Sequence, residues 1–362
     1  MNKASIENIL VSLLLFCSVS CSEKVEGLIT TFTIRPDKEA YQSVAVSDLV
    51  SSVEHIRISS VSANFSPGER VIYTRGKYYL TDRNDASVVI LNAEGEMLQT
   101  INRRGRKTDE YVSFSDYDVN PSNGEISVYD ATSSKILVYS EKGEFLRRIV
   151  FDRETEWPRS FVSLEDGSYL CYLPEYDFPS IGPVPRRGLW RTADSGEFMD
   201  YLLTFKDEYK FVQFRTTGYF SRLSDGTISL VGEEDKDYIY HISPDGMSLE
   251  PAYHFRFDRK IPARLLTRSP EELSLSDRFY YKYWFRETDG WILLTTIFFP
   301  ENTACHFFYN KRIQKAYVVT DKNELIDDMG INGLGMNAAP DRLMKTDYDE
   351  AGLPEIVVAY LK

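Results

Sequence analysis

The chain reads GKYYLTD at Gly76–Asp82 and SVVILNAEGEMLQTI at Ser87–Ile101, and 48 residues later it reads GEISVYD at Gly124–Asp130 and KILVYSEKGEFLRRI at Lys135–Ile149. The two units align without a gap, and each reads as strand, turn, strand, hairpin and strand. Six pairs of positions are identical: Gly76/Gly124, Asp82/Asp130, Gly95/Gly143, Glu96/Glu144, Leu98/Leu146 and Ile101/Ile149. A period of roughly 40 to 50 residues with several strands per unit is typical of a β-propeller blade.

The same pattern continues along the chain in three less regular units. Short apolar runs separated by Asp-Gly and similar turns occupy 166–203, 225–257 and 280–319. Asp-Gly between such runs is a strong signal for a tight turn between two strands. Together with the first two units, at 70–101 and 118–151, the sequence therefore predicts five complete blades.

A sixth blade has to be assembled from strand-like runs that lie before the first unit and after the fifth. Glu355–Leu361 reads as a strand, whereas 321–353 is acidic and shows no clear pattern. First and last strands that share a blade leave no open sheet edge in a ring. We expect the C-terminal strand to pair with Thr30–Ile34 or with Val53–Ile58. The predicted fold is all-β, a six-bladed β-propeller at 30–362 closed by N- and C-terminal strands.

Composition supports this fold class and limits the partners. Aromatic residues make up 14% of the chain, with 24 Tyr and 21 Phe, and these residue types favour the half-buried surface of a sheet. The net charge of −13 disfavours nucleic acid as a partner, because nucleic-acid binding needs positive charge to neutralise phosphates. It also disfavours adsorption of the domain to anionic lipid. We expect a monomer that contacts the membrane only through an N-terminal lipid.

The N-terminus carries the features of an export signal. Ile9–Phe16 is an apolar run too short to span a bilayer. Small residues from Ser18 then lead to Cys21, an arrangement that resembles a bacterial lipobox. We interpret 1–20 as a lipoprotein signal peptide, Cys21 as the lipidated residue and 21–29 as a linker. This interpretation places the protein on the outer membrane, on its periplasmic or cell-surface face. The alternative is an ordinary secretory signal with an incidental cysteine.

One longer run resembles a known family. Gly105–Tyr111 is followed by Phe114–Val119 and then by Asn123–Asp130, and the chain ends in the strand Ile356–Tyr360. This succession is similar to that of the six-bladed β-propeller lipoproteins of the Bacteroidota, which are related to NHL-repeat and TolB-like propellers. The resemblance implies a propeller in the cell envelope. Its motifs are structural, so it implies no particular chemistry.

Local motifs for catalysis or metal binding are lacking in the sequence. The four histidines are not at metal-ligand spacing and no Cys-x-x-Cys or Gly-x-Ser-x-Gly occurs. We therefore predict no metal site, no cofactor and no catalytic residue. A propeller can still assemble a metal site at its channel from acids on different blades, and such a site is invisible to local motifs. A metal-dependent hydrolase or lyase using the central channel stays open as the alternative.

A basic segment between the first two blades is the first candidate for ligand binding. Its members are Arg103, Arg104, Arg106, Glu110 and Tyr111. Arginine pairs with carboxylate or phosphate groups through two parallel hydrogen bonds, so this segment could hold an anionic ligand. The alternative is a solvated loop, because surface charges usually contribute little.

An insertion in the third unit is the second candidate. Residues 174–187 separate two strand-like runs and are rich in proline and aromatic residues. The candidate binding residues are Tyr176, Phe178, Arg186, Arg187 and Trp190. Aromatic and arginine side chains are enriched at binding hot spots, and loops on a rigid scaffold often carry function. We expect this insertion at one mouth of the channel. The alternative is a loop that packs only on its own blade.

These observations favour a binding module over an enzyme. The sequence predicts an exported, lipid-anchored propeller that binds an envelope protein, a peptide or a glycan, and it does not identify the ligand.

Overall fold

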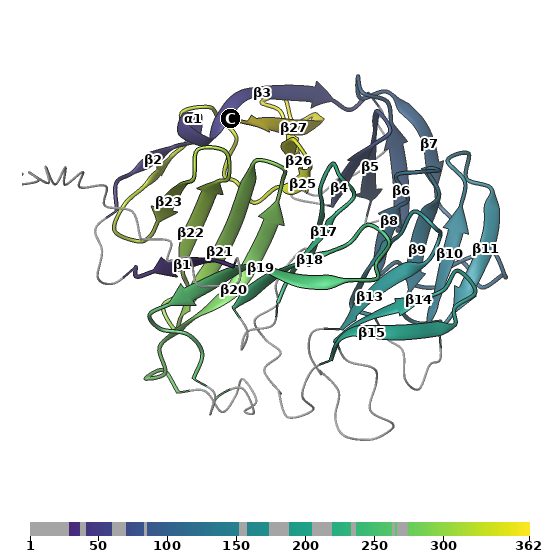
Figure 1. Cartoon of the computed structure of the whole chain (residues 1–362). Coiled ribbons are helices and arrows are strands. Elements are labelled where there is room, and N and C mark those ends of the chain that lie inside the picture. The colour runs from purple at the N-terminus through teal and green to yellow at the C-terminus, as the bar shows by residue number, and fades with distance from the viewer. Residues whose placement is uncertain are drawn as a thin grey trace, which may run out of the picture.

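The structure is a computed structural model that describes residues 29–36, 41–59, 70–82, 85–151, 158–173, 188–204, 219–232, 237–262, 265 and 274–362. The regular secondary structure of the described part consists of strands and one short helix, α1 (Val46–Leu49). Six sheets of four or five strands are arranged in a ring (Figure 1). The prediction of an all-β, six-bladed propeller is confirmed.

The first three blades follow the units predicted from the sequence. Blade one contains β4 (Val71–Thr74), β5 (Lys77–Asp82), β6 (Ser87–Leu91) and β7 (Met97–Ile101). Blade two contains β8 (Asp116–Val119), β9 (Ile126–Asp130), β10 (Lys135–Tyr139) and β11 (Phe145–Val150). Blade three contains β12 (Ser160–Ser163), β13 (Tyr169–Leu173), β14 (Gly188–Thr192) and β15 (Phe198–Thr204).

The other three blades include both ends of the described chain. Blade four contains β16 (Phe220–Arg222), β17 (Ile228–Val231), β18 (Tyr238–Ile242), β19 (Leu249–Phe257) and the added β1 (Thr30–Ile34). Blade five contains β20 (Phe279–Glu287), β21 (Trp291–Phe299), β22 (Thr303–Asn310) and β23 (Lys315–Val319). Blade six contains β25 (Asn337–Ala339), β26 (Arg342–Tyr348), β27 (Pro354–Leu361) and β3 (Val50–Arg57).

Ring closure uses one of the two N-terminal strands that the sequence offered. β27 pairs antiparallel with β3, with Ile356 opposite Ile56, so the early strand forms the outer edge of the last blade. β1 has a different role, because it pairs in parallel with β19 and adds a fifth strand at the edge of blade four (Figure 1). The alternative that placed Thr30–Ile34 in the sixth blade is therefore wrong.

The segment without a clear sequence pattern contains three strands. β24 (Leu325–Ile326) pairs in parallel with β2 (Val44–Ala45), and β25 and β26 are the first two strands of blade six. β26 was missed because its buried residues include the polar Lys345 and Thr346, which interrupt the apolar run. Its pairing with β27 therefore defines the strand more clearly than its own composition does.

The hydrophobic core is divided into six main clusters, one between each pair of neighbouring blades. β27 illustrates how one strand serves two of them, since Ile356 and Val358 pack toward blade one while Val357 and Ala359 pack toward blade five. Successive side chains point to opposite faces of a sheet, so a blade between two neighbours buries both faces. Its strands then read as continuous apolar runs instead of alternating patterns.

The glycines of the sequence repeat occupy two kinds of turn. Gly76 and Gly95 both have positive φ, +69° and +85°, where side chains other than hydrogen are strained. Their surroundings differ. A Cβ on Gly76 would meet no atom within 4 Å, whereas a Cβ on Gly95 would lie 2.3 Å from the carbonyl oxygen of Arg57, on blade six. Gly95 therefore also permits close approach between neighbouring blades.

We expect Gly95→Ala to destabilise the protein more than Gly76→Ala. Both substitutions carry the backbone strain of positive φ, of about 1–2 kcal/mol. Only Gly95→Ala forces blades one and six apart, which adds roughly 1–3 kcal/mol of overpacking. Urea denaturation of the two variants measures the difference, and equal losses would show that the inter-blade contact is not tight.

We expect deletion of 354–362 to unfold the whole ring, because β27 lies between β26 and β3 and its loss exposes two sheet edges. Deletion of Lys362 alone is the control. That change removes the terminal hydrogen bonds, from Lys362 N to Leu49 O at 3.0 Å and to Lys362 O from Trp291 Nε1 at 2.8 Å and Asn310 Nδ2 at 3.5 Å. Thermal unfolding and size-exclusion chromatography separate the two variants. A longer truncation that stays monomeric with an unchanged melting temperature contradicts closure by β27.

Candidate functional site

The first strands of the blades meet at the centre of the ring. Each lies at one end of its sheet, and contacts connect β4 to β8, β8 to β12, β16 to β20, β20 to β25 and β25 to β4. Side chains on these strands therefore come from different blades and still lie close together. Charged side chains of different blades interact in this region.

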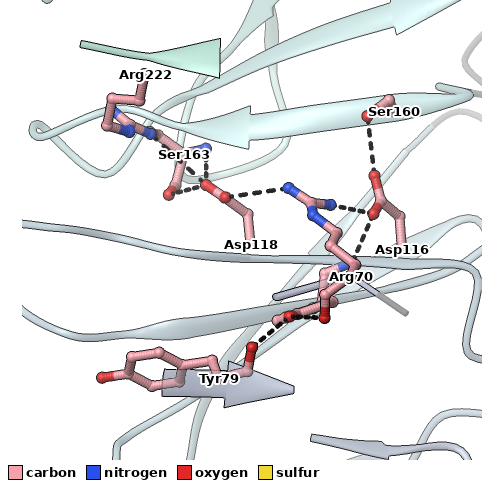
Figure 2. Close-up of polar contacts among 8 residues, drawn as sticks. Arg70, Tyr79, Asp116, Asp118, Ser160, Ser163 and Arg222 are labelled. Atoms are coloured by element: carbon pink, nitrogen blue, oxygen red, sulfur yellow. Dashed lines mark hydrogen bonds and ion pairs between the residues drawn. The ribbon is translucent and has the colours of Figure 1, made fainter. Parts of the chain in front are cut away.

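Arg70 precedes β4 and lies between two carboxylates of blade two (Figure 2). Its Nη1 hydrogen-bonds Asp116 Oδ1, and its Nη2 is 3.5 Å from Asp118 Oδ1. Burial opposes the charge of Arg70, but Asp116 and Asp118 outweigh burial and raise the pKa of Arg70. About a third of the side chain, 34%, is nevertheless exposed.

The strand period of β8 places both carboxylates beside Arg70. Asp116 and Asp118 are two residues apart, so they share a face of the strand, and Tyr117 points the other way. The Tyr117 hydroxyl is buried and donates to the carbonyl oxygens of Tyr79, at 2.8 Å, and Arg70, at 3.0 Å. These bonds join blade two to blade one and fix the position of Arg70.

Serines of blade three hold the far sides of the two carboxylates (Figure 2). Asp118 Oδ2 accepts hydrogen bonds from the backbone N of Ser163, at 2.8 Å, and from its Oγ, at 2.6 Å. Asp116 Oδ2 accepts one from Ser160 Oγ at 3.0 Å. Both acids are thus engaged by neighbouring blades and have little capacity left for another ligand.

Arg222 approaches the same group from blade four. Its Nη2 donates to the Ser163 carbonyl oxygen at 2.7 Å and lies 3.7 Å from Asp118 Oδ2, beyond hydrogen-bonding distance. Burial lowers the pKa of Arg222 more than Asp118 and the nearby Glu165 raise it, and Arg70 lowers it further. We call Arg70, Asp116, Asp118, Ser160, Ser163 and Arg222 the axial cluster.

A third arginine of the inner strands is close enough to interact with Arg70. Arg286 on β20 donates from Nη1 to the Phe285 carbonyl oxygen at 2.7 Å, and its guanidinium lies 5.3 Å from the Trp284 ring centroid. Burial and the positive charge of Arg70 lower the pKa of Arg286 to about 9, so the side chain stays charged at neutral pH. The axis therefore carries three arginines from three blades.

The described residues contain no group of three or more His, Cys, Asp and Glu side chains that could hold a metal ion. The buried Glu287 is an example of an acid that is paired within the protein. It accepts from Ser229 Oγ at 2.5 Å, His241 Nε2 at 3.1 Å and Lys311 Nζ at 2.8 Å. Burial opposes its charge, but His241 and Lys311 outweigh burial and lower the pKa of Glu287. This group ties blade four to blade five.

The basic segment predicted to bind a ligand is an ordered connection between blades one and two. Glu110 Oε2 accepts from the backbone N of Lys107 at 2.9 Å, and this bond lowers the pKa of Glu110. Tyr111 is completely buried and its hydroxyl donates to the Ala86 carbonyl oxygen at 2.5 Å. Tyr111 therefore has no surface for a ligand, and its assignment to binding is wrong. Arg103, Arg104 and Arg106 are exposed, and the binding role predicted for them stays a prediction.

Most of the predicted insertion site lies outside the described residues, including Tyr176, Phe178, Arg186 and Arg187. Trp190 is described, and it is completely buried on β14 in the cluster between blades two and three. Its assignment to ligand binding is wrong, because a strand buried on both faces carries apolar residues for packing. An indole on such a strand contributes to stability.

The two segments predicted to bind a ligand, the basic segment and 174–187, connect to their strands at the same end of the ring. Part of the axial cluster also lies at this end. Leu173 pairs with Gly188, so 174–187 connects β13 and β14 at the end where Ser160 lies. The basic segment leads into blade two at this end as well. There the carboxylate of Asp130, which follows the Tyr129 that pairs with Asp116, accepts a hydrogen bond from the backbone N of Val112 at 2.9 Å. We call this the Ser160 end of the ring.

The axial cluster was not predicted from the sequence. Asp116 and Asp118 lie within the run Phe114–Val119, and acids at alternate positions of a blade's first strand were the available signal. Arg70 and Arg222 lie far from that run and show no local motif. Only the ring brings them together.

Comparisons with known proteins agree with this architecture. A solved structure from Bacteroides fragilis, described as a candidate exported protein, matches with a TM-score of 0.70 and 14% identity over 92% of this chain and 100% of that chain. A member of the DUF4221 family from Bacteroides vulgatus matches with a TM-score of 0.53 and 10% identity, over 87% of this chain and 97% of that one. At these identities the likeness shows a shared fold. No curated protein sequence matches the chain.

The resemblance to Bacteroidota propellers is thus supported for the fold, while the relation to NHL-repeat and TolB-like propellers stays a prediction. None of the described helices is long and apolar enough to cross a membrane. A family model described as a domain of unknown function, DUF4934, matches residues 29–337. Because this match spans most of the chain, the protein belongs to the DUF4934 family.

Proposed function

We propose that this protein is an exported binding module of the cell envelope whose ligand contacts the axial cluster. The observation that carries the proposal is the convergence of Arg70, Asp116, Asp118 and Arg222 from three blades at the ring axis. Charged side chains are costly to bury unless they are paired or serve a ligand. Arg70 and Arg222 are both partly accessible, with 34% and 22% of the side chain exposed.

The arrangement supports binding more than catalysis. A general acid or base needs a proton-transfer group that can reach its substrate. Asp116 and Asp118 are instead engaged by Arg70 and by serines of blade three. A metal-dependent hydrolase or lyase was the alternative, and no observation among the described residues favours it. The axial groups are suited to holding a ligand by charge and hydrogen bonds.

The proposed location rests on the N-terminal sequence and on one relative. Small residues before Cys21 resemble a lipobox, and the similar Bacteroides fragilis structure is described as a candidate exported protein. In this proposal Cys21 carries the lipid and the propeller is held at the outer membrane. Cys21 lies outside the described residues. The partner classes are an envelope protein, a peptide or a glycan, bound by a monomer.

The segments at the Ser160 end add to the proposed site. The exposed Arg103, Arg104 and Arg106 and the insertion 174–187 are attached there. They would select the ligand, while the axial cluster anchors its charged part.

We expect the wild-type protein to retain a ligand that depends on Arg222. Protein extracted from envelopes in mild detergent is incubated with the small-molecule, oligosaccharide and peptide fraction of the same envelopes, desalted and analysed by native mass spectrometry. Arg222→Ala should lose the added mass, since it removes an axial guanidinium. Arg148→Ala, which removes an exposed arginine of β11, is the matched control and should keep it. Retention of nothing by the wild type, or equal retention by all three proteins, argues against the proposal.

We also expect the mature protein to begin at an acylated Cys21. The intact mass of membrane-extracted protein should show loss of 1–20 and addition of acyl chains, each buried CH₂ of which contributes about 0.8 kcal/mol to membrane binding. Cys21→Ser should be released from the membrane fraction. A different mature N-terminus, or a mass without lipid, removes the anchor from the proposal without affecting the axial site.

A further inference from the structure

We infer that the group recognised by the axial cluster is an anion, a carboxylate or a phosphate, held by Arg222 with Arg70 nearby. This inference rests on the proposed function, because it names the chemical class of the ligand for the same site. It concerns local positive charge at the axis, although the chain as a whole has a net charge of −13.

The carboxylates of the cluster are already neutralised and hydrogen-bonded. Asp116 interacts with Arg70 and Ser160, and Asp118 accepts two hydrogen bonds from Ser163 and lies 3.5 Å from Arg70. A cationic ligand would have to compete with Arg70 for both of them. The acids therefore organise the arginines and do not form a binding site for a cation.

Arg222 has the geometry of a donor that awaits a partner. Among the described residues, its guanidinium makes one hydrogen bond, from Nη2 to the Ser163 carbonyl oxygen, at 2.7 Å. That bond fixes the orientation of the guanidinium, and the carboxylate of Asp118 stays 3.7 Å away. A guanidinium presents five donors in a planar fork that matches carboxylate and phosphate oxygens. Nε and Nη1 can therefore contact a planar or tetrahedral anion.

The electrostatic balance around the axis also favours an anion. Arg70, Arg222 and Arg286 approach from three blades, while Arg70 already interacts with both Asp116 and Asp118. Burial lowers the pKa of both Arg222 and Arg286, and the charge of Arg70 adds to this effect in each case. A bound anion would offset the burial and the repulsion from Arg70 that Arg222 experiences. Glu165, which also interacts with Arg222, is exposed and therefore screened by solvent.

The anion could belong to a sugar acid or peptide carboxylate, or to a phosphate ester, and the test separates these sources. Isothermal titration of the detergent-extracted protein uses glucuronate, inorganic phosphate and glucose, the last as a neutral sugar matched to glucuronate. We expect binding of glucuronate or phosphate, weaker affinity at higher salt, and no heat with glucose. The anion that binds more tightly identifies the source.

Variants connect this binding to the axis. Arg222→Ala should weaken anion binding about tenfold or more, because a charged hydrogen-bonded pair is lost. Arg222→Lys keeps the charge but not the fork, so it should recover only part of the affinity. Arg148→Ala should bind as the wild type does, and melting temperatures establish that all variants are folded.

Two results overturn the inference. One is binding of neither anion. The other is equal anion affinity in the wild type and Arg222→Ala. If the wild type meanwhile retains an uncharged envelope molecule that Arg222→Ala loses, the proposed binding function stands and only the anionic class is wrong. Retention of no envelope molecule at all would instead count against the proposed function itself.

Discussion

The pairing of β27 with β3 is the constraint on which the rest of the ring depends. Every blade buries both faces against its neighbours, so no blade has a complete core of its own. Blade six becomes a full sheet only when an early strand of the chain, Val50–Arg57, completes it. The axial cluster inherits this dependence. Arg70, Asp118 and Arg222 are brought together by the closed ring, because they lie in or directly beside strands of three separate sheets.

The sequence predicted the parts of this fold that repeat. Units one and two share Gly95 and Gly143, turn residues with positive φ, and their apolar strands are regular enough to align. Blade six was the least readable. β26 mixes Lys345 and Thr346 with its apolar residues, and only pairing with β27 decides that it is a strand. The N-terminal alternatives could not be separated either, since Thr30–Ile34 and Val53–Ile58 both read as strands and tertiary pairing alone assigns them.

The candidate site was less predictable than the fold, for two physical reasons. Aromatic residues that pack in a core are the same residue types that form recognition surfaces. Trp190, on a buried strand, and Tyr111, in the connection between blades one and two, were misassigned for this reason. Residues that converge on an axis come from distant parts of the chain. Arg70 and Arg222 are separated by three blades' worth of sequence, yet both interact with Asp118. Spacing along a single sequence contains no information about such a contact.

The strand β1 has a mechanical consequence. Its five residues lie parallel to β19, from Thr30 opposite Tyr253 to Ile34 opposite Phe257, with Phe32 and Ile34 buried between blades four and five. Tension applied to the chain ahead of Thr30 would act along this ladder, so its hydrogen bonds would share the load in shear. Between β1 and β3 the chain is held once more, by β2 against β24. A pull from the N-terminal side would thus reach blade four first and leave the closing strand β3 unloaded.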